Sequence, residues 1–360
     1  MSPSIRFPEF TGEWENKRIG DIGKFFSGGT PSSSRKDFYG GEIPFIRSGE
    51  IHSDKTELFL TQEGYKNSSA KMVEVGDILL ALYGANSGDI SISQMRGAIN
   101  QAILCIRTNV APVFFKSVWE KHAQKILNTY LQGGQGNLSA DIVKKITISI
   151  PSQIEQAKIA ALFSHLDERI SIQNRLIDRL QSLMIGIAQK IAHSNKPNVR
   201  ISDCLECSSS ALQESEVNKT GKYPVYGANG IVGYIDKYHT QNEAIYIIKD
   251  GSGVGGVSYV TGKCSSTGTL NILQAKNGHS LKYLYYLLKV FNFVPYKTGM
   301  AIPHIYFKDY GKAKIFCPAY PEQLEYAKLL SSIDGNLRIA LDSLKNFNLQ
   351  KQYLLRHMLI

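Results

Sequence analysis

Residues 151–191 read PSQIEQAKIAALFSHLDERISIQNRLIDRLQSLMIGIAQKI, and residues 318–358 read PAYPEQLEYAKLLSSIDGNLRIALDSLKNFNLQKQYLLRHM. The second stretch repeats the first without a gap, at a distance of 318 − 151 = 167 positions. Seven of the first seventeen aligned positions are identical, and they pair Pro151, Glu155, Gln156, Ala160, Leu162, Ser164 and Asp167 with Pro318, Glu322, Gln323, Ala327, Leu329, Ser331 and Asp334. A repeat of this length predicts a molecule with two equivalent halves.

Both stretches carry apolar residues at alternating steps of three and four positions, which is the spacing of a coiled-coil seam. The first seam is Leu166, Ile170, Gln173, Ile177, Leu180, Met184, Ile187 and Ile191, and the second is Ile333, Leu337, Ala340, Leu344, Phe347, Lys351, Leu354 and Met358. Each helix has one partner of equal length, so the sequence predicts an intramolecular coiled coil. The pseudo-two-fold repeat favours an antiparallel pair, with Pro151 and Pro318 near the first helical position.

The composition is that of a folded protein, with 43% hydrophobic residues among 360. No apolar run approaches the roughly 20 residues that span a bilayer, and the opening MSPSIRFPEF lacks the apolar core of a signal peptide, so we expect a cytoplasmic protein. The five cysteines are odd in number and irregularly spaced, which favours free thiols. Cys204 and Cys207 form one C-x-x-C without a second pair or a neighbouring histidine, so the sequence predicts no metal site.

The net charge of +10 is unevenly distributed along the chain. Residues 1–150 contain 17 basic and 15 acidic residues, whereas residues 197–317 contain 13 basic and 8 acidic residues. A basic excess attracts polyanions, and nucleic acid is the commonest polyanion that a protein of this kind meets. The charge therefore favours a nucleic-acid partner, most strongly for residues 197–317.

The segments before the two helices are predicted to be rich in β-strands. Short β-branched or aromatic runs occur at residues 42–47, 76–82, 90–93 and 103–107, and again at residues 244–248, 257–260 and 269–273. One further helix is expected in each segment, at residues 113–127 and 281–291. We therefore predict an α+β fold with two β-rich domains, at residues 1–150 and 197–317, and two spacer helices, at residues 151–196 and 318–360.

Several sequence motifs of enzymes are absent or in the wrong context. Residues 250–256, DGSGVGG, satisfy G-x-G-x-x-G, but the next residues, VSYV, continue as a strand instead of opening the helix that a dinucleotide site needs. The chain has no P-loop, no H-E-x-x-H, no G-x-S-x-G, and no Asn-Pro-Pro or Asp-Pro-Pro run of an amino-methyltransferase. We predict no catalytic residues and interpret the glycine-rich stretch as a β-turn.

The loops contain residues suited to DNA. Asparagine can bond adenine through two contacts, arginine can bond guanine, and lysine or serine can bond phosphates. The candidate DNA-binding residues are Arg35, Lys36, Arg47, Tyr83, Asn86, Tyr226, Asn229, Lys249, Ser252, Lys297 and His304. Glycine and asparagine also simply make turns, so this alternative stays open for each loop.

A β-rich domain, a long helix that starts P-x-x-x-E-Q, a second β-rich domain and a second such helix together resemble the specificity subunit of type I restriction–modification systems. The resemblance extends over nearly the whole chain and is supported by RFPEF at residues 6–10, GGTPS at residues 28–32 and GMAIPHI at residues 299–305. One departure from the family pattern is GGQGNL at residues 133–138. The corresponding motif in the second half of the chain contains a proline, whereas this one does not.

This resemblance implies two target-recognition domains, each reading one half of a split sequence in double-stranded DNA. The paired helices would set the gap between the half-sites and dock two methyltransferase subunits. Adenine N6 methylation with S-adenosylmethionine, and translocation and cleavage driven by ATP with magnesium, would belong to the methyltransferase and restriction subunits, so this chain would need no cofactor.

Two other readings remain open from the residues alone. The chain could be a coiled-coil scaffold whose β-rich domains bind proteins, in which case DNA affinity that falls with salt is not expected. It could also be a self-contained methyltransferase, which predicts that the chain alone binds S-adenosylmethionine. The missing methyltransferase motif speaks against the second of these.

Overall fold

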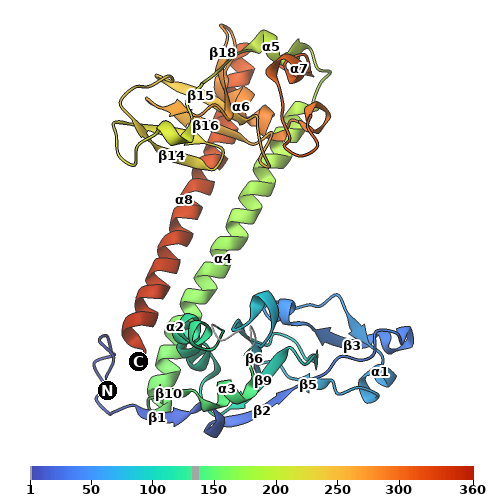
Figure 1. The fold of residues 1–360 in the computed structure, drawn as a ribbon, viewed down its shortest axis with the longest axis vertical. Coiled ribbons are helices and arrows are strands. Elements are labelled where there is room, and N and C mark those ends of the chain that lie inside the picture. Colours follow the sequence, from blue (N-terminus) through green and yellow to red (C-terminus); the bar gives the residue numbers. More distant parts are fainter. Residues whose placement is uncertain (1, 132–137) are drawn as a thin grey trace. The chain divides into compact units, whose positions relative to one another are not determined.

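The computed structural model describes residues 2–131 and 138–360, so most of the glycine-rich stretch at residues 133–138 lies outside the described residues. The chain divides into two compact units (Figure 1). Unit 1 comprises Met1–Gln173 and Ser343–Ile360, and unit 2 comprises Asn174–Asp342. Each unit therefore contains one β-rich region and one part of each long helix, α4 (Gln153–Ala192) and α8 (Tyr320–Met358).

The β-rich region of unit 1 contains two four-stranded sheets. In the first, the antiparallel order is β2 (Gly23–Ser27), β9 (Ile103–Thr108), β6 (Ile78–Ala81) and β7 (Ile90–Ile92). In the second, the order is β4 (Phe59–Leu60), β3 (Tyr39–Ile46), β8 (Gly97–Ile99) and β5 (Lys71–Val73), with β3 and β8 parallel. A short pair, β1 (Glu15–Arg18) and β10 (Thr147–Ile150), leads into α4.

Unit 2 repeats this arrangement. Its main sheet has the antiparallel order β12 (Leu205–Ser209), β18 (Leu270–Ala275), β15 (Glu243–Ile248) and β16 (Val257–Thr261). A second sheet joins β14 (Gly230–Ile235), β13 (Tyr223–Gly227) and β17 (Ser265–Ser266), and a short pair joins β11 (Val199–Arg200) to β19 (Lys314–Ile315). The internal repeat therefore extends from the helices to the sheets.

Shorter helices complete both units. They are α1 (Gln62–Lys66), α2 (Pro112–Leu131) and α3 (Ala140–Lys145) in unit 1, and α5 (Ile201–Cys204), α6 (Leu281–Val290) and α7 (Phe307–Tyr310) in unit 2. The predicted helices at residues 113–127 and 281–291 correspond to α2 and α6. The predicted α+β class with two β-rich regions and two long helices is confirmed. None of the helices formed by residues 2–131 and 138–360 combines the length and apolar character that crossing a membrane requires.

The glutamine of the repeated Glu-Gln pair connects each long helix to its β-rich region. The side chain of Gln156 accepts a hydrogen bond from the backbone N–H of Ala111 (3.1 Å) and donates one to the carbonyl of Pro151 (2.9 Å). Gln323 repeats both bonds, with the backbone N–H of Ser280 (2.9 Å) and the carbonyl of Pro318 (2.8 Å). Both glutamines are buried, so each amide satisfies backbone groups that water cannot reach.

We call the two hydrogen bonds of each glutamine the glutamine latch. They show that the predicted position of the prolines was wrong. The first intrahelical bonds are accepted by the carbonyls of Ser152 and Ala319, so Pro151 and Pro318 lie one residue before the N-caps and not near the first helical position. Their carbonyls remain outside the helices because each accepts a bond from the glutamine side chain. The predicted helix starts were therefore about one half-turn early.

The two long helices pack antiparallel within each unit. In unit 1, Asp167 of α4 pairs with Lys351 of α8, and Arg169 lies over the ring of Phe347. In unit 2, Met184 and Ala188 of α4 line the same small pocket as Leu337 of α8. Rising numbers in α4 thus meet falling numbers in α8, which is the antiparallel orientation that the repeat predicted (Figure 1).

The residues predicted for the seam are shielded from solvent. Leu166, Ile177, Met184, Ile333, Leu337 and Met358 are buried, and Ile170, Leu180, Ile187, Leu344, Phe347 and Leu354 are partly buried. The polar seam residue Lys351 has a specific explanation, because its ammonium contacts Asp167 of α4 (2.7 Å) and Glu120 of α2 (2.8 Å). Lys116 of α2 contacts the same two carboxylates, at 2.7 and 3.0 Å. These four residues form an alternating-charge cluster that joins α2, α4 and α8.

Candidate nucleic-acid interface

Four of the predicted DNA-binding residues come together in unit 2, on the loop after β15 and on the hairpin before α7. The backbone N–H of Gly251 donates to the carbonyl of Pro303 (3.0 Å), and that of Ile305 donates to the carbonyl of Lys249 (2.9 Å). Thr298 and His304 exchange two backbone hydrogen bonds across the hairpin, at 2.9 and 2.7 Å. This loop surface, residues 249–256 with residues 297–306, carries Lys249, Ser252, Lys297 and His304.

Glycines allow this local structure. Gly251 has a φ of +96°, and Gly299 has a φ of +87°. A Cβ on Gly299 would also lie only 2.3 Å from the carbonyl oxygen of Ile302. After the glycine-rich loop the chain enters β16 at Val257, not a helix, so the predicted β-turn is confirmed and the stretch lacks the helix N-terminus of a dinucleotide site.

The loop surface offers several kinds of contact to a ligand. The Nδ1 atom of His304 lies 2.7 Å from Asp250 Oδ1, which orients the imidazole, and the ring stacks on Tyr306. Met300 is fully exposed at 102%, and Ile302 is 59% exposed, at the tip of the hairpin. Exposed apolar side chains beside cations suit insertion into a DNA groove, where apolar residues can wedge between base steps.

Tyr306, Met300 and Ile302 were not among the predicted site residues. The sequence did contain a signal, because GMAIPHI at residues 299–305 precedes a tyrosine and Lys308. Lys308 lies over the ring of Tyr306, at 5.4 Å from its centroid. Met300 and Ile302 are exposed because Gly299 permits the turn at the hairpin tip. Their apolar character alone would have assigned both residues to the core.

Several lysines of unit 2 lie over aromatic rings. Five such pairs occur, namely Lys222 with Tyr223, Lys263 with Tyr238, Lys282 with Tyr259, Lys289 with Tyr285, and Lys308 with Tyr306. Within residues 197–317, all of which the structure describes, no lysine or arginine forms an ion pair with a carboxylate. The basic excess of this region is thus not neutralised internally, which leaves its charge available to an anionic partner.

Unit 1 differs, because its candidate arginines already hold carboxylates. Arg35 donates three guanidinium hydrogen bonds to Asp37, the shortest at 2.6 Å. Arg47 contacts Glu50 (2.8 Å) and Glu57 (3.2 Å), and hydrogen bonds from Arg47 lower the pKa of Glu50 to about 2. A DNA ligand would have to compete with these carboxylates for either guanidinium.

The remaining candidates have mixed surroundings. Tyr83 is partly exposed and Asn86 is exposed on a 3₁₀ turn (Gly84–Asn86), and the amide of Asn86 lies close to Gly49, next to the Arg47–Glu50 pair. Lys36 is exposed beside Arg35, and Asn229 is exposed in the turn between β13 and β14. Tyr226 packs edge-to-face on the buried Tyr246, and burial raises its pKa, so its ring is poorly placed to stack on a base.

Comparisons with known proteins concern the chain and its fold as a whole. The sequence model described as the type I restriction modification DNA specificity domain matches residues 11–182 and 194–346. The structure is similar over its full length to the S subunit of a type I restriction–modification system from M. genitalium, with a TM-score of 0.73, 16% identity and 99% of that chain covered. At this identity the likeness concerns the fold.

Curated relatives match over shorter stretches. The specificity subunit of the type I restriction enzyme MjaIX from Methanocaldococcus jannaschii is 28% identical over 185 residues, which is 47% of this chain and 42% of the relative. That of HindI from Haemophilus influenzae is 28% identical over 188 residues, which is 48% of this chain and 40% of the relative. The chain spans about two fifths of the length of these curated relatives.

Proposed function

Because the chain belongs to the type I restriction modification DNA specificity family, we propose that it is the DNA-recognition subunit of a type I restriction–modification complex. Each β-rich region reads one half of a bipartite site in double-stranded DNA. The observation that carries this proposal is the repeat itself. Two sheets with equivalent strand orders each belong to a region that is connected to a long helix by the same glutamine latch. Equivalent scaffolds with different loops suit the reading of two different half-sites.

The working division of the chain follows from this proposal. Target recognition belongs to residues 1–150 and 197–317, and the spacer function belongs to residues 151–196 and 318–360. At 1.5 Å per residue, the 40 residues of α4 extend over roughly 60 Å, which corresponds to at most about 18 base pairs of DNA at 3.4 Å each. Paired helices of this length are stiff enough to fix the gap between two half-sites.

The long helices also present a surface for partner subunits. Their outer faces expose apolar side chains that the seam does not use, namely Ile172, Leu176, Leu183 and Ile185 on α4, and Leu329, Ile339, Leu341, Leu349 and Tyr353 on α8. Exposed apolar residues in such numbers are typical of protein interfaces. We assign these faces to two methyltransferase subunits, which bring S-adenosylmethionine; restriction subunits bring ATP and magnesium, and this chain contributes recognition without catalysis.

Modification mapping tests the proposed function. The chain is coexpressed with a methyltransferase subunit of its own system in a host without DNA methylation, and the DNA is sequenced for N6-methyladenine. We expect methylation at one split motif with a constant gap, because two readers on fixed helices recognise two half-sites together. If the complex forms but no motif is methylated, the scaffold reading, in which the β-rich regions bind proteins, replaces the proposal.

The loop surface of unit 2 makes a second prediction. Changing Lys249→Ala or Lys297→Ala removes one cation that forms no ion pair with a carboxylate of the described residues. We expect each change to reduce the slope of log affinity against log salt by about 1 and to weaken binding to matched and mismatched sites alike. Binding of the complex to the mapped site, measured at several salt concentrations, checks this.

The matched control is Lys190→Ala, which removes an exposed lysine from α4 of the same unit. Its salt slope should equal that of the unmodified complex. Equal slopes for the loop variants and the unmodified complex would remove the loop surface from the DNA interface.

A further inference from the structure

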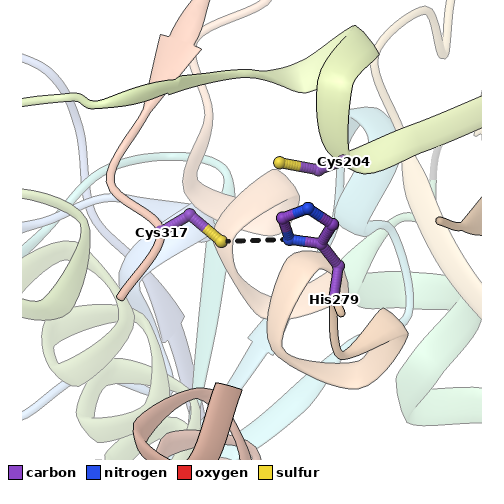
Figure 2. Close-up of side chains that lie close together, drawn as sticks. All are labelled: Cys204, His279 and Cys317. Carbon is purple, nitrogen blue, oxygen red and sulfur yellow. Dashed lines mark hydrogen bonds between the residues drawn. The ribbon is translucent and has the colours of Figure 1, made fainter. Parts of the chain in front are cut away.

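Three side chains from distant parts of the sequence meet in unit 2, where its β-rich region joins α8. Cys204 is the last residue of α5, His279 precedes the N-cap of α6, and Cys317 lies between β19 and α8. One ligand atom from each lies within 4.8 Å of the other two, and Cys317 Sγ lies 3.5 Å from His279 Nδ1. Figure 2 shows the three side chains directed toward a common point.

The spacing fits a tetrahedral metal centre. Zinc binds thiolate sulfur at about 2.3 Å and imidazole nitrogen at about 2.0–2.1 Å, and tetrahedral angles then place sulfur and nitrogen about 3.5 Å apart. The sulfur–nitrogen distance of 3.5 Å between Cys317 and His279 equals this value. Two thiolates and one imidazole form a ligand set that selects soft or borderline metals such as zinc over magnesium or calcium.

The first half of the chain has aliphatic residues at the three equivalent positions. Cys317 precedes Pro318 as Ile150 precedes Pro151. His279 precedes the residue whose N–H binds the latch glutamine, as Val110 does in unit 1. Cys204 directly precedes the strand that pairs with β18, and Ile22 directly precedes the strand that pairs with β9.

In unit 1 these equivalents belong to the core. Val110 and Ile150 are buried members of the main hydrophobic cluster, and Ile22 packs against it. The fold therefore needs only apolar side chains at these positions. In unit 2 all three are metal-ligating types, and this joint replacement is not explained by packing.

The surroundings hold the ligands in place and leave one side open. Cys204 and Cys317 are buried, whereas His279 is only partly buried. The side chain of Asn198 bonds both the backbone N–H and the carbonyl of Cys317, each at 2.8 Å.

We propose that Cys204, His279 and Cys317 bind one zinc ion, with water as the fourth ligand. The ion joins the start of β12, the start of α6 and the segment that enters α8. It thereby fixes the second β-rich region to its long helix, where unit 1 uses aliphatic packing. The C-x-x-C pair does not act as a unit, because Cys207 Sγ contacts the carbonyl of Ser208 and takes no part in the cluster.

Cobalt titration of the purified, reduced full-length chain tests this proposal. We expect one cobalt ion per chain, with the intense visible bands of tetrahedral coordination and a thiolate charge-transfer band, and complete displacement by zinc. Loss of a residue that merely supports a ligand costs about 10–100-fold in metal affinity, so Cys204→Ser and Cys317→Ser should each weaken binding by about 100-fold or more. Cys207→Ser is the matched control and should bind cobalt like the unmodified chain.

A variant that copies unit 1 separates metal binding from folding. Cys204→Ile, His279→Val and Cys317→Ile together should keep the circular dichroism spectrum and bind no metal. EDTA should lower the Tm of the unmodified chain by several degrees and leave that of the triple variant unchanged. The proposal is overturned if the unmodified chain gives no tetrahedral cobalt spectrum, or if the triple variant binds cobalt equally well. It is also overturned if peptide mapping of the reduced chain, kept with zinc, finds Cys204 and Cys317 joined in a disulfide.

Discussion

Asp167→Asn is expected to lower the free energy of unfolding of unit 1 by about 2 kcal/mol. Asp167 accepts from Lys116 and Lys351, both at 2.7 Å, and the substitution leaves these two ammonium groups with Glu120 as their shared carboxylate. Removing one partner of a fully buried pair costs about 3–5 kcal/mol, and we expect less here because the Asp167 side chain is 33% exposed. Urea unfolding measures the loss, and both tryptophans, Trp14 and Trp119, are buried in unit 1 and report on it.

The repeat supplies a matched control for this substitution. Asp334 stands at the position equivalent to Asp167, but among the described residues its ion-pair partner is Arg338, at 3.8 Å, and that arginine is 79% exposed. Exposed ion pairs contribute about 0–1 kcal/mol. Asp334→Asn should therefore lower the free energy of unfolding, followed by far-UV circular dichroism, by less than about 1 kcal/mol. Equal losses for the two variants would contradict a special role for the charge cluster of α2, α4 and α8.

The charge cluster also predicts a pH dependence. Burial alone would raise the pKa of Asp167, but hydrogen bonds from Lys116 and Lys351 outweigh it, so the folded pKa lies below the ordinary value. A depressed carboxylate pKa contributes stability that is present above the unfolded pKa of about 3.9 and is lost as pH falls through the folded pKa. The stability difference between the unmodified chain and Asp167→Asn should therefore be full at pH 7 and shrink below about pH 4.

Much of the fold was predictable because its dominant signals are local or periodic. The heptad spacing predicted both long helices, the pseudo-two-fold repeat predicted their antiparallel pairing, and β-branched runs predicted the main strands. The sequence could not show why Gln156 and Gln323 recur, since their partners, the N–H groups of Ala111 and Ser280, lie 45 and 43 residues away. The sequence also could not explain why the charged Lys351 occupies a seam position. The structure explains it, because Glu120 and Asp167 lie beside its ammonium group.

The candidate interface was less predictable, and for a physical reason. Loop composition indicates which residues can bind DNA, but the availability of each side chain depends on its neighbours. Arg47 holds Glu50 and Glu57, and Tyr226 packs on Tyr246, whereas Lys249 and Lys297 have no carboxylate partner in unit 2. The Cys204–His279–Cys317 cluster could not be predicted from the short spacings of known metal-binding motifs, because its members lie 75 and 38 positions apart in the sequence.

Inserting residues into both long helices is expected to change the recognised DNA site rather than simply abolish binding. The insertions belong between Gln173 and Asn174 and between Asp342 and Ser343, where the two units meet in sequence. Whole heptads preserve the phase of the seam, and equal insertions preserve the antiparallel pairing. One heptad adds about 10 Å, which corresponds to about 3 base pairs. Methylation of the original motif should be lost in mapping experiments.

Rotation decides which insertion restores a usable site. Three base pairs turn B-DNA by about 100°, whereas a left-handed coiled coil with a pitch near 150 Å turns by only about −25° over one heptad. One heptad therefore misaligns the two readers, and methylation at the longer gap should be weak. Three heptads add about 31 Å, or about 9 base pairs, and turn the coiled coil by about −75° while the DNA turns by about 310°, which is equivalent to −50°.

The three-heptad variant should therefore methylate strongly at the same two half-sites with a gap about 9 base pairs longer. Two heptads serve as the control for phase, because about 6 added base pairs leave the readers on different sides of the DNA. Insertion into α4 alone serves as the control for pairing, since it displaces every seam contact beyond the insertion. An unchanged gap in the three-heptad variant would show that the paired helices do not set the distance between the half-sites.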